Sequence, residues 1–390
     1  MNLTKLREQT PATQHLLHLN NAGAALTPQP VMQAILDHLQ LEQELGAYEA
    51  QEKALEKSEN FYHAFARMLN CNPREIAYAE SASRAWTLLF QAIPLEPGDR
   101  IITSQTEYAS NFLTLLHIAK KRQITLDIIP DDASGQLDIE ELKKRIDADV
   151  RLIAITHIPS QTGRINPAEE VGRIARKHRI LYLLDACQSA GQMDLDVNRL
   201  GCDMLIGTGR KYLRGPRGTG FMYVRHAILD YLQPTTIDLH SAIWVKPDIY
   251  HLRDDARRFE QWESFLAGKI GLASAVDYAL SLGLPAIEAR VQKLAAMLRA
   301  RLNTIKGVTV HDQGDKLSGI CTFSSTQLPA LDIRDALRQQ GTNLSVVRKS
   351  NAVFDFEKRA LGDICRASVH YYNTEQELDT FYQQLDKLLK

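Results

Sequence analysis

Short apolar runs alternate with stretches of helical period along most of the chain. The runs at 180–184 and 204–206 are long enough for buried strands and too short for helices. The predicted strands are residues 75–79, 100–104, 124–129, 151–156, 180–184 and 204–206. The predicted helices around them are residues 31–69, a stretch opening at 80–86, 138–146, 167–178 and 264–282. This alternation favours the α/β class, with a mainly parallel sheet lying between helices.

The pattern changes after Gly283-Leu284-Pro285, where a long helix is expected to end. Beyond it we expect helices at 286–302 and 331–340, strands at 308–310, 320–324 and 344–347, and a final helix. We therefore divide the chain into an N-terminal segment (1–30), a large domain (31–284) and a smaller C-terminal α+β domain (285–390).

Composition narrows the range of partners. The 390 residues suffice for one large domain or two, and 44% hydrophobic with 24% charged residues is an ordinary globular balance. A formal net charge of -1 gives no electrostatic reason to expect nucleic acid or an anionic membrane. No apolar run approaches the about 20 residues of a membrane span. The opening MNLTKLREQT lacks the apolar core of a signal peptide.

The cysteines indicate a reducing compartment. There are five, at positions 71, 187, 202, 321 and 365, and none shows C-x-x-C spacing. An odd count without such spacing is typical of reduced thiols rather than of a disulfide framework or a zinc site. We expect a cytoplasmic protein with no bound metal.

Candidate chemistry begins with a carboxylate and a lysine that follow neighbouring predicted strands. Asp185 stands where the strand at 180–184 ends, and Lys211 lies in the glycine-rich loop after 204–206. Ligands gather at the carboxyl ends of parallel strands, so both side chains can face one pocket. Taken singly, Asp185 fits a turn or helix cap and Lys211 a solvated loop. Together they are what pyridoxal 5'-phosphate (PLP) requires, a lysine for a Schiff base and an acid for the pyridinium nitrogen.

Three motifs carry a family resemblance. They are Asp185-Ala186-Cys187-Gln188, Thr208-Gly209-Arg210-Lys211 and Gly215-Pro216-Arg217-Gly218-Thr219-Gly220. The set resembles the class V aminotransferase group of fold-type I PLP enzymes, which carry Asp-x-x-Gln, Ser/Thr-Gly-His/Arg-Lys and Gly-Pro-x-Gly-x-Gly. The resemblance implies the fold-type I architecture and PLP as the cofactor.

The same resemblance implies a role for each residue at these motifs. Lys211 would form the Schiff base and then act as general base on the substrate Cα proton. Asp185 would pair with the ring nitrogen, and Gln188 would hydrogen-bond the phenolic oxygen of the cofactor. Thr208 and Arg210 would neutralise phosphate charge, with Arg210 where relatives often have His.

Three upstream turns complete the implied cofactor site. Ser81-Ala82-Ser83 opens a helix, whose free N–H groups and positive dipole end suit a phosphate. Tyr108 stands where related desulfurases have a His that stacks on the pyridine ring, and the aromatic ring of Tyr can stack on the cofactor in the same way. Ser160 stands where the group has a polar residue near the phenolic oxygen, with Gln161 as a second candidate.

The substrate side is implied by the two ends of the chain. Arg366, in Cys365-Arg366-Ala367-Ser368, stands where desulfurase-like relatives grip the substrate α-carboxylate, and a guanidinium fork suits that group. In the resembled group the N-terminal segment lies over the active site, which places Asn21 and Ala24 near the pocket. We therefore expect a small molecule, an amino acid, as the substrate.

A further motif implies a homodimer. Arg258-Phe259-Glu260 matches the Arg-Phe-Glu of the desulfurases, which continue with a Gly-Thr that reaches the neighbouring subunit's phosphate. Trp262-Glu263 replaces that pair here, and Ser264 is an alternative contact. Such contacts would place the active sites at a subunit interface.

The expected reaction follows from one departure from the family pattern. Cysteine desulfurases need a mobile-loop cysteine upstream of the closing arginine, and residues 345–364 contain none. The stretches LNNAGAALTP, RRFEQWE and RASVHYYNTE look like those of cystine lyases and hercynylcysteine sulfoxide lyases. We therefore expect a carbon–sulfur lyase that eliminates a cysteine derivative to pyruvate and ammonia. Epimerisation, as in isopenicillin N epimerases, and transamination are the alternatives; cysteine desulfuration ranks below them, and an inactive PLP-fold scaffold ranks last.

Overall fold

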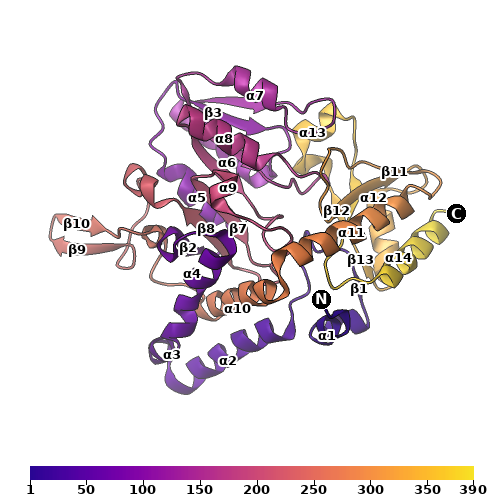
Figure 1. Cartoon of the computed structure of the whole chain (residues 1–390), viewed down its shortest axis with the longest axis horizontal. Coiled ribbons are helices and arrows are strands. Elements are labelled where there is room, and N and C mark those ends of the chain that lie inside the picture. The colour runs from indigo at the N-terminus through magenta and orange to yellow at the C-terminus, as the bar shows by residue number, and fades with distance from the viewer.

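A seven-stranded sheet forms the centre of the protein (Figure 1). The computed structural model describes all 390 residues. The strand order is β2 (Ile76–Ala79), β8 (Gly220–Val224), β7 (Met204–Thr208), β6 (Leu181–Asp185), β5 (Val150–Thr156), β3 (Arg100–Ser104) and β4 (Thr125–Ile129). All neighbouring strands are parallel except in the two pairs that involve β8. The predicted α/β class with a mainly parallel sheet is confirmed.

Helices cover both faces of this sheet because its buried strands are apolar on both sides. Along β6, Tyr182 and Leu184 join one core cluster and Leu183 joins the other. The first cluster includes residues of α4 (Leu55–Leu69), α8 (Ala168–His178) and α10 (Leu266–Leu282). The second includes α5 (Ala82–Ala92) and α6 (Ala109–Arg122). Short helices α7 (Ile139–Arg145) and α9 (Val197–Leu200) lie in the connections. The result is a three-layer arrangement of helices, sheet and helices, in which the ends of the strands are left uncovered by the helices.

A second, antiparallel sheet lies in the C-terminal part of the chain. Its order is β11 (Val308–Val310), β12 (Ile320–Ser325), β15 (Ile364–Ser368) and β14 (Ser345–Val347). The helices of this part are α11 (Leu284–Leu302), α12 (Ala330–Gln339), α13 (Val353–Lys358) and α14 (Glu375–Leu388). The predicted division at residue 284 stays a prediction.

The N-terminal residues join the C-terminal part of the chain. Strand β1 (Leu17–His18) pairs in parallel with β13 (Thr342–Asn343). From α1 (Leu3–Glu8), Arg7 forms an ion pair with Glu377 at 2.7 Å. Two residues after β1, Asn20 also bridges Ser368 at the end of β15, the strand that carries Arg366.

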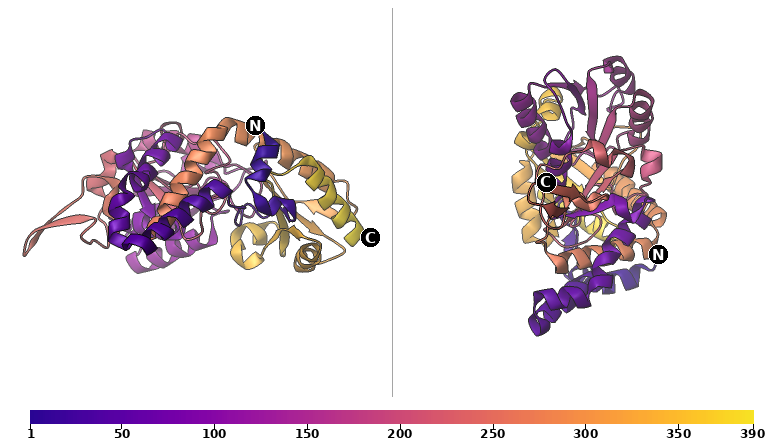
Figure 2. Two further views of the ribbon diagram at one scale, coloured as in Figure 1. Left: turned by 90° about the horizontal axis from the view of Figure 1, so that it is seen from below. Right: turned by 90° about the vertical axis from the view of Figure 1, so that its left-hand side faces the viewer.

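Three features differ from the pattern-based expectations. The helical stretch at 31–69 is three helices, α2 (Gln29–Leu45), α3 (Ala47–Lys53) and α4, and Gly46 breaks it with φ +93°. Strands β9 (Ala242–Lys246) and β10 (Ile249–Leu252) form a hairpin that stands away from the body (Figures 1 and 2). Helix α13 forms within what was expected to be a loop. Short 3₁₀-helices are η1 (Pro11–Gln14), η2 (Pro73–Glu75), η3 (His226–Tyr231), η4 (Ala256–Phe259) and η5 (Lys349–Asn351).

The helices fall short of what a membrane-spanning helix requires. No single helix is both long and apolar enough to cross a bilayer, and α10 with α11 meet the criterion only as a pair bent by 81°.

Candidate active site

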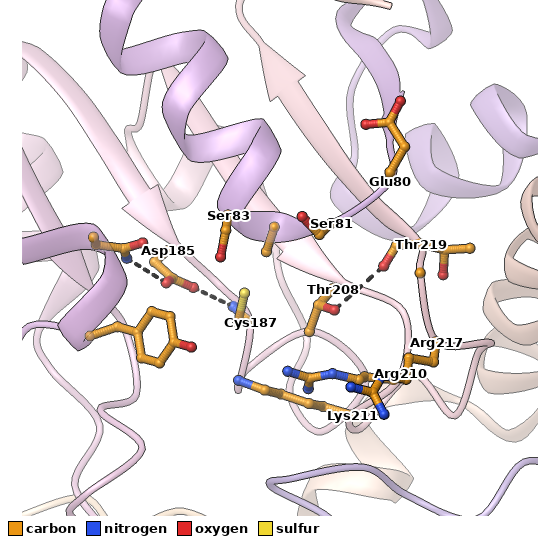
Figure 3. A pocket seen from close by; sticks show the side chains of 14 residues that line it. Glu80, Ser81, Ser83, Asp185, Cys187, Thr208, Arg210, Lys211, Arg217 and Thr219 are labelled. Carbon is orange, nitrogen blue, oxygen red and sulfur yellow. Dashed lines mark hydrogen bonds between the residues drawn. The ribbon is translucent and has the colours of Figure 1, made fainter. Parts of the chain in front are cut away.

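A cavity of about 240 Å³ opens where β6 and β7 end and α5 begins (Figure 3). Neighbouring parallel strands bring their carboxyl ends to one edge of the sheet, which is why residues 26 positions apart along the chain meet here. The predicted residues that line the cavity are Ser81, Ala82, Ser83, Tyr108, Asp185, Thr208, Arg210 and Lys211.

Lys211 follows β7 and enters this cavity with 8% of its surface exposed. Its ammonium has no ion-pair partner, and its Nζ lies 5.8 Å from the centre of the Tyr108 ring. Burial lowers the pKa of Lys211, an effect that the nearby Cys187 and Asp185 oppose in part. A buried lysine with a depressed pKa is a nucleophilic amine, as Schiff-base chemistry requires.

Asp185 ends β6 at the opposite side of the cavity and is held by two hydrogen bonds (Figure 3). Its Oδ1 accepts the backbone N–H of Cys187 at 2.8 Å, and its Oδ2 accepts from Asn111 Nδ2 at 2.7 Å. No cation of the chain forms an ion pair with it. A carboxylate fixed in this way suits a cationic ring nitrogen placed in the cavity.

The N-terminus of α5 forms the third side of the cavity. Ser81 caps the helix, and its Oγ accepts the backbone N–H of Arg84 at 3.1 Å. A Cβ on Gly220 would lie within 3.0 Å of Ser81 and Ala82 backbone atoms, so glycine allows β8 to approach this turn closely. Arg210, Arg217, Thr208 and Thr219 also line this side. Free N–H groups and cations gathered at one helix start fit a phosphate.

These residues fit PLP as a group. The cavity offers an amine, a carboxylate opposite it, an anion site at a helix start and the Tyr108 ring. They correspond to the aldehyde, ring nitrogen, phosphate and flat ring of that cofactor.

The other predicted residues lie next to the cavity without lining it. Gln188 donates to the Ala22 carbonyl at 3.0 Å, and its buried Oε1 has no partner.

Asn21 is buried; its amide donates to the Ser368 carbonyl at 2.7 Å, and its oxygen accepts from the Tyr372 hydroxyl. The Ala24 carbonyl lies 2.8 Å from His18 Nε2, while the neighbouring Gly23 carbonyl accepts from Arg210 at 2.7 Å. Asn21 and Ala24 thus shape a segment that contacts Arg210, and their side chains are not seen to reach the cavity.

Arg366 lies on β15, beside Ser160. Its Nη1 donates to the Ser160 carbonyl at 3.1 Å, its buried Nε has no partner, and no carboxylate of the chain pairs with it. Burial lowers the pKa of Arg366 to about 10. The positive charge of Arg366 also contributes to the lowered pKa of Lys211, so the two cations are neighbours. The Ser160 hydroxyl and the Gln161 amide turn elsewhere, the latter donating to the Thr106 carbonyl at 2.9 Å.

Six residues that line the cavity were not predicted from the sequence as site residues: Glu80, Asn111, Cys187, Arg217, Gly218 and Thr219. Asn111 lies one helical turn after Tyr108, and that spacing is the signal that could have found it. Arg217 and Thr219 stand inside a quoted motif without an assigned role. Cys187 also stands inside a quoted motif without an assigned role; it lines the cavity, and burial raises its pKa well above the ordinary value.

Known proteins resemble the chain over its full length. It is 28% identical over 396 residues to a probable cysteine desulfurase of Methanothermobacter thermautotrophicus, covering 100% of this chain and 98% of that one. A solved cysteine desulfurase of Thermococcus onnurineus NA1, without ligand, matches with a TM-score of 0.92 at 27% identity, over 99% of this chain and 98% of that one. A C-DES variant with glycine covalently linked to its PLP cofactor has the same fold, with a TM-score of 0.88 at 22% identity over 97% and 98%.

These likenesses correct the expected reaction. The sequence analysis placed elimination of a cysteine derivative to pyruvate and ammonia first, with epimerisation or transamination as alternatives, and ranked cysteine desulfuration below them. That ranking is wrong, because the sequence relatives that match over nearly the whole chain, and the solved structures with the higher TM-scores, are named cysteine desulfurases.

Family membership rests on a match that spans most of the chain. The model of the family described as "Aminotransferase class-V" matches residues 17–381. The predicted cofactor is confirmed with it, since PLP is what this family binds and what the cavity fits. The chain therefore belongs to the class V aminotransferase family of PLP-dependent, fold-type I enzymes.

Proposed function

We propose that this protein acts on L-cysteine and breaks its carbon–sulfur bond, as a cysteine desulfurase does. The observation that carries the proposal is the pairing of the buried Lys211 with its half-buried neighbour Arg366, which has no carboxylate partner in the chain. Such a pair suits an α-amino acid, whose amino and carboxylate groups are one carbon apart. The names of the similar proteins support cysteine as the amino acid.

Lys211 serves as the proton acceptor in this proposal. PLP, when bound, supplies an electron sink that stabilises negative charge at the substrate Cα. The lowered pKa of Lys211 leaves a larger share of its amine unprotonated near neutral pH, ready to take the Cα proton. The Tyr108 ring beside Nζ excludes water from one side of that amine.

Arg366 serves to orient the substrate. The substrate carboxylate would accept a hydrogen bond from the unpaired Nε–H of Arg366 and a second one from another N–H of the same guanidinium group. The guanidinium keeps its orientation through the Ser160 carbonyl. Fixing the carboxylate in this way fixes the direction of the Cα–H bond relative to Lys211.

The sulfur acceptor in this proposal is a thiol supplied from outside the chain. Burial raises the pKa of all five cysteines, and none lies in residues 345–364. The incoming thiolate attacks the cysteine sulfur; an S–S bond forms as the Cβ–S bond breaks, and the electron pair remains with Cβ. Protonation then gives alanine and a persulfide of the acceptor, so atoms and electrons balance.

A homodimer and a cytoplasmic location belong to the same proposal. The β9–β10 hairpin stands away from the body and exposes Ile243, Trp244 and Tyr250, with Trp244 70% exposed. Exposed apolar side chains on a projecting arm are typical of a surface that packs against another chain. Five free thiols without a disulfide fit a reducing compartment.

The test is a product assay on PLP-loaded protein offered L-cysteine, with and without dithiothreitol as the added thiol. We expect alanine in amounts that rise with the thiol, and none from Lys211→Ala. A Lys211→Arg variant is the matched control, because it keeps the charge and removes the reactive amine. Pyruvate and ammonia without alanine, or no product from protein that retains the colour of bound PLP, would refute the proposed function.

A further inference from the structure

A second buried carboxylate, Glu107, lies behind Asp185. It stands between β3 and α6 and is 5% exposed. Its Oε1 accepts the backbone N–H of Tyr108 at 2.9 Å, the Asn111 amide at 3.0 Å and the Thr156 hydroxyl. Its Oε2 is buried and has no partner. A side chain held by three donors on one oxygen has a fixed position, while its other oxygen is buried without a hydrogen-bond partner.

Asn111 joins this carboxylate to the cofactor site. Its Nδ2 donates to Glu107 Oε1 at 3.0 Å and to Asp185 Oδ2 at 2.7 Å. Both hydrogens of one amide nitrogen are therefore used between two carboxylates. Any rotation of the Glu107 side chain would pull the Asn111 amide away from Asp185. Glu107 therefore fixes the orientation of Asp185 through Asn111.

Two carboxylates so close together and so buried do not both ionise readily. The side chains that face Glu107 are Asn111 from α6, Thr156 from β5, and Asp185 and Tyr182 from β6, while Tyr108 contributes its backbone N–H. No cation forms an ion pair with it. Burial, and then the charge of Asp185, raise the pKa of Glu107 to about 7. Tyr182 stays neutral because burial raises its own pKa further.

We propose that Glu107 is a positioning residue of the cofactor site, which carries a proton on Oε2 and acts on the ring nitrogen through Asn111 and Asp185. When the proton leaves, a second negative charge stands behind Asp185. That charge favours a cation at the ring nitrogen and at Lys211 Nζ. The cofactor environment thus has two charge states that differ by one proton on a residue outside the cavity. This inference concerns PLP binding and holds whichever amino acid is the substrate.

The test is a pH titration of the visible absorption of the bound PLP between pH 6 and 9, with the dissociation constant of PLP measured at both ends. Wild type should show a spectral step with its midpoint between about pH 6 and 7, as Glu107 ionises, because a cation at the ring nitrogen favours the ionised carboxylate. Glu107→Gln keeps an oxygen for the three donors and cannot ionise, so it should bind PLP while lacking this step. Glu80→Gln makes the same change at an exposed carboxylate that lines the cavity and should keep the step.

Two results would overturn the inference. One is a wild-type spectrum without a step between pH 6 and 8, which can be read even if Glu107→Gln does not fold. The other is a step with the same midpoint in Glu107→Gln, since the titrating group would then be a different one, such as Lys211. A merely structural role would lower PLP affinity in Glu107→Gln equally at all pH values and leave the midpoint in place.

Discussion

Replacing Arg366 by Met should stabilise the protein while removing substrate binding. Burial lowers the pKa of Arg366 from 12.5 to about 10, so the folded state disfavours its charge. At about 1.4 kcal/mol per pH unit this difference amounts to about 3 kcal/mol. Because Arg366 is partly exposed to the cavity, where water screens it, we take about 2 kcal/mol. Loss of the hydrogen bond to the Ser160 carbonyl lowers the stability of the variant by about 1 kcal/mol.

The net effect is a gain of about 1 kcal/mol at pH 7, where Arg366 is charged in both the folded and the unfolded state. For 390 residues the unfolding entropy is about 0.8 kcal/mol per degree, which predicts a rise in Tm of about 1 °C. The same variant should need about 100-fold more amino acid to change the spectrum of bound PLP, because a charged hydrogen-bonding fork is lost.

The assays are thermal unfolding of the PLP-free protein and spectral titration of the PLP-loaded protein with L-cysteine. Arg299→Met is the matched control: Arg299 is half-buried like Arg366, but it pairs with Asp312 at 2.7 Å, so its replacement should lower the stability of the protein. If Arg366→Met lowers the Tm as much as Arg299→Met does and leaves cysteine binding unchanged, the reasoning is refuted. Arg366 would then contribute to stability and would not be kept unpaired in order to bind the substrate.

Three further predictions follow from the site and the surface. Tyr108→Leu should weaken PLP binding about fivefold, or about 1 kcal/mol, whereas Tyr108→Phe should not, as fluorescence titration can measure. The raised folded pKa of Glu107, about 7 against 4.5, means that its contribution to stability is present at low pH and is lost as pH rises between these values. Glu107→Gln should remove up to about 3 kcal/mol of this pH dependence in urea unfolding. Trp244→Asp should shift the sedimentation of the protein to that of a monomer, while Leu113→Asp, at another exposed apolar position, should not.

The cofactor pocket could be predicted from the sequence because it follows from strand order. Asp185 and Lys211 each follow a buried apolar run, and parallel pairing of β6 with β7 brings their ends together. The side of the cavity formed by the start of α5 was predictable for a similar reason, since small residues there mark a helix N-terminus, whereas its binding of the cofactor phosphate stays a prediction.

Other parts of the site depend on contacts that no local pattern encodes. Glu107 meets Asp185 only because α6 places Asn111 between them, and neither residue is close to Asp185 along the chain. The lack of a partner for Arg366 is a property of its surroundings on β15 and cannot be read from its neighbours in sequence. The β9–β10 hairpin was missed because its apolar residues are exposed, whereas a pattern of burial was used to find strands.

The measurement that tests the central claim most directly is peptide mapping after borohydride reduction of the PLP-loaded protein. Reduction fixes the cofactor to the lysine that holds it, and mass spectrometry then identifies the modified peptide. The account predicts modification of Lys211, whose buried amine has no ion-pair partner. Lys269 is the buried alternative, but it donates to the Tyr62 hydroxyl at 2.6 Å and lies 3.8 Å from Glu260. Modification of Lys269 or of a surface lysine, with Lys211 left free, would contradict the account.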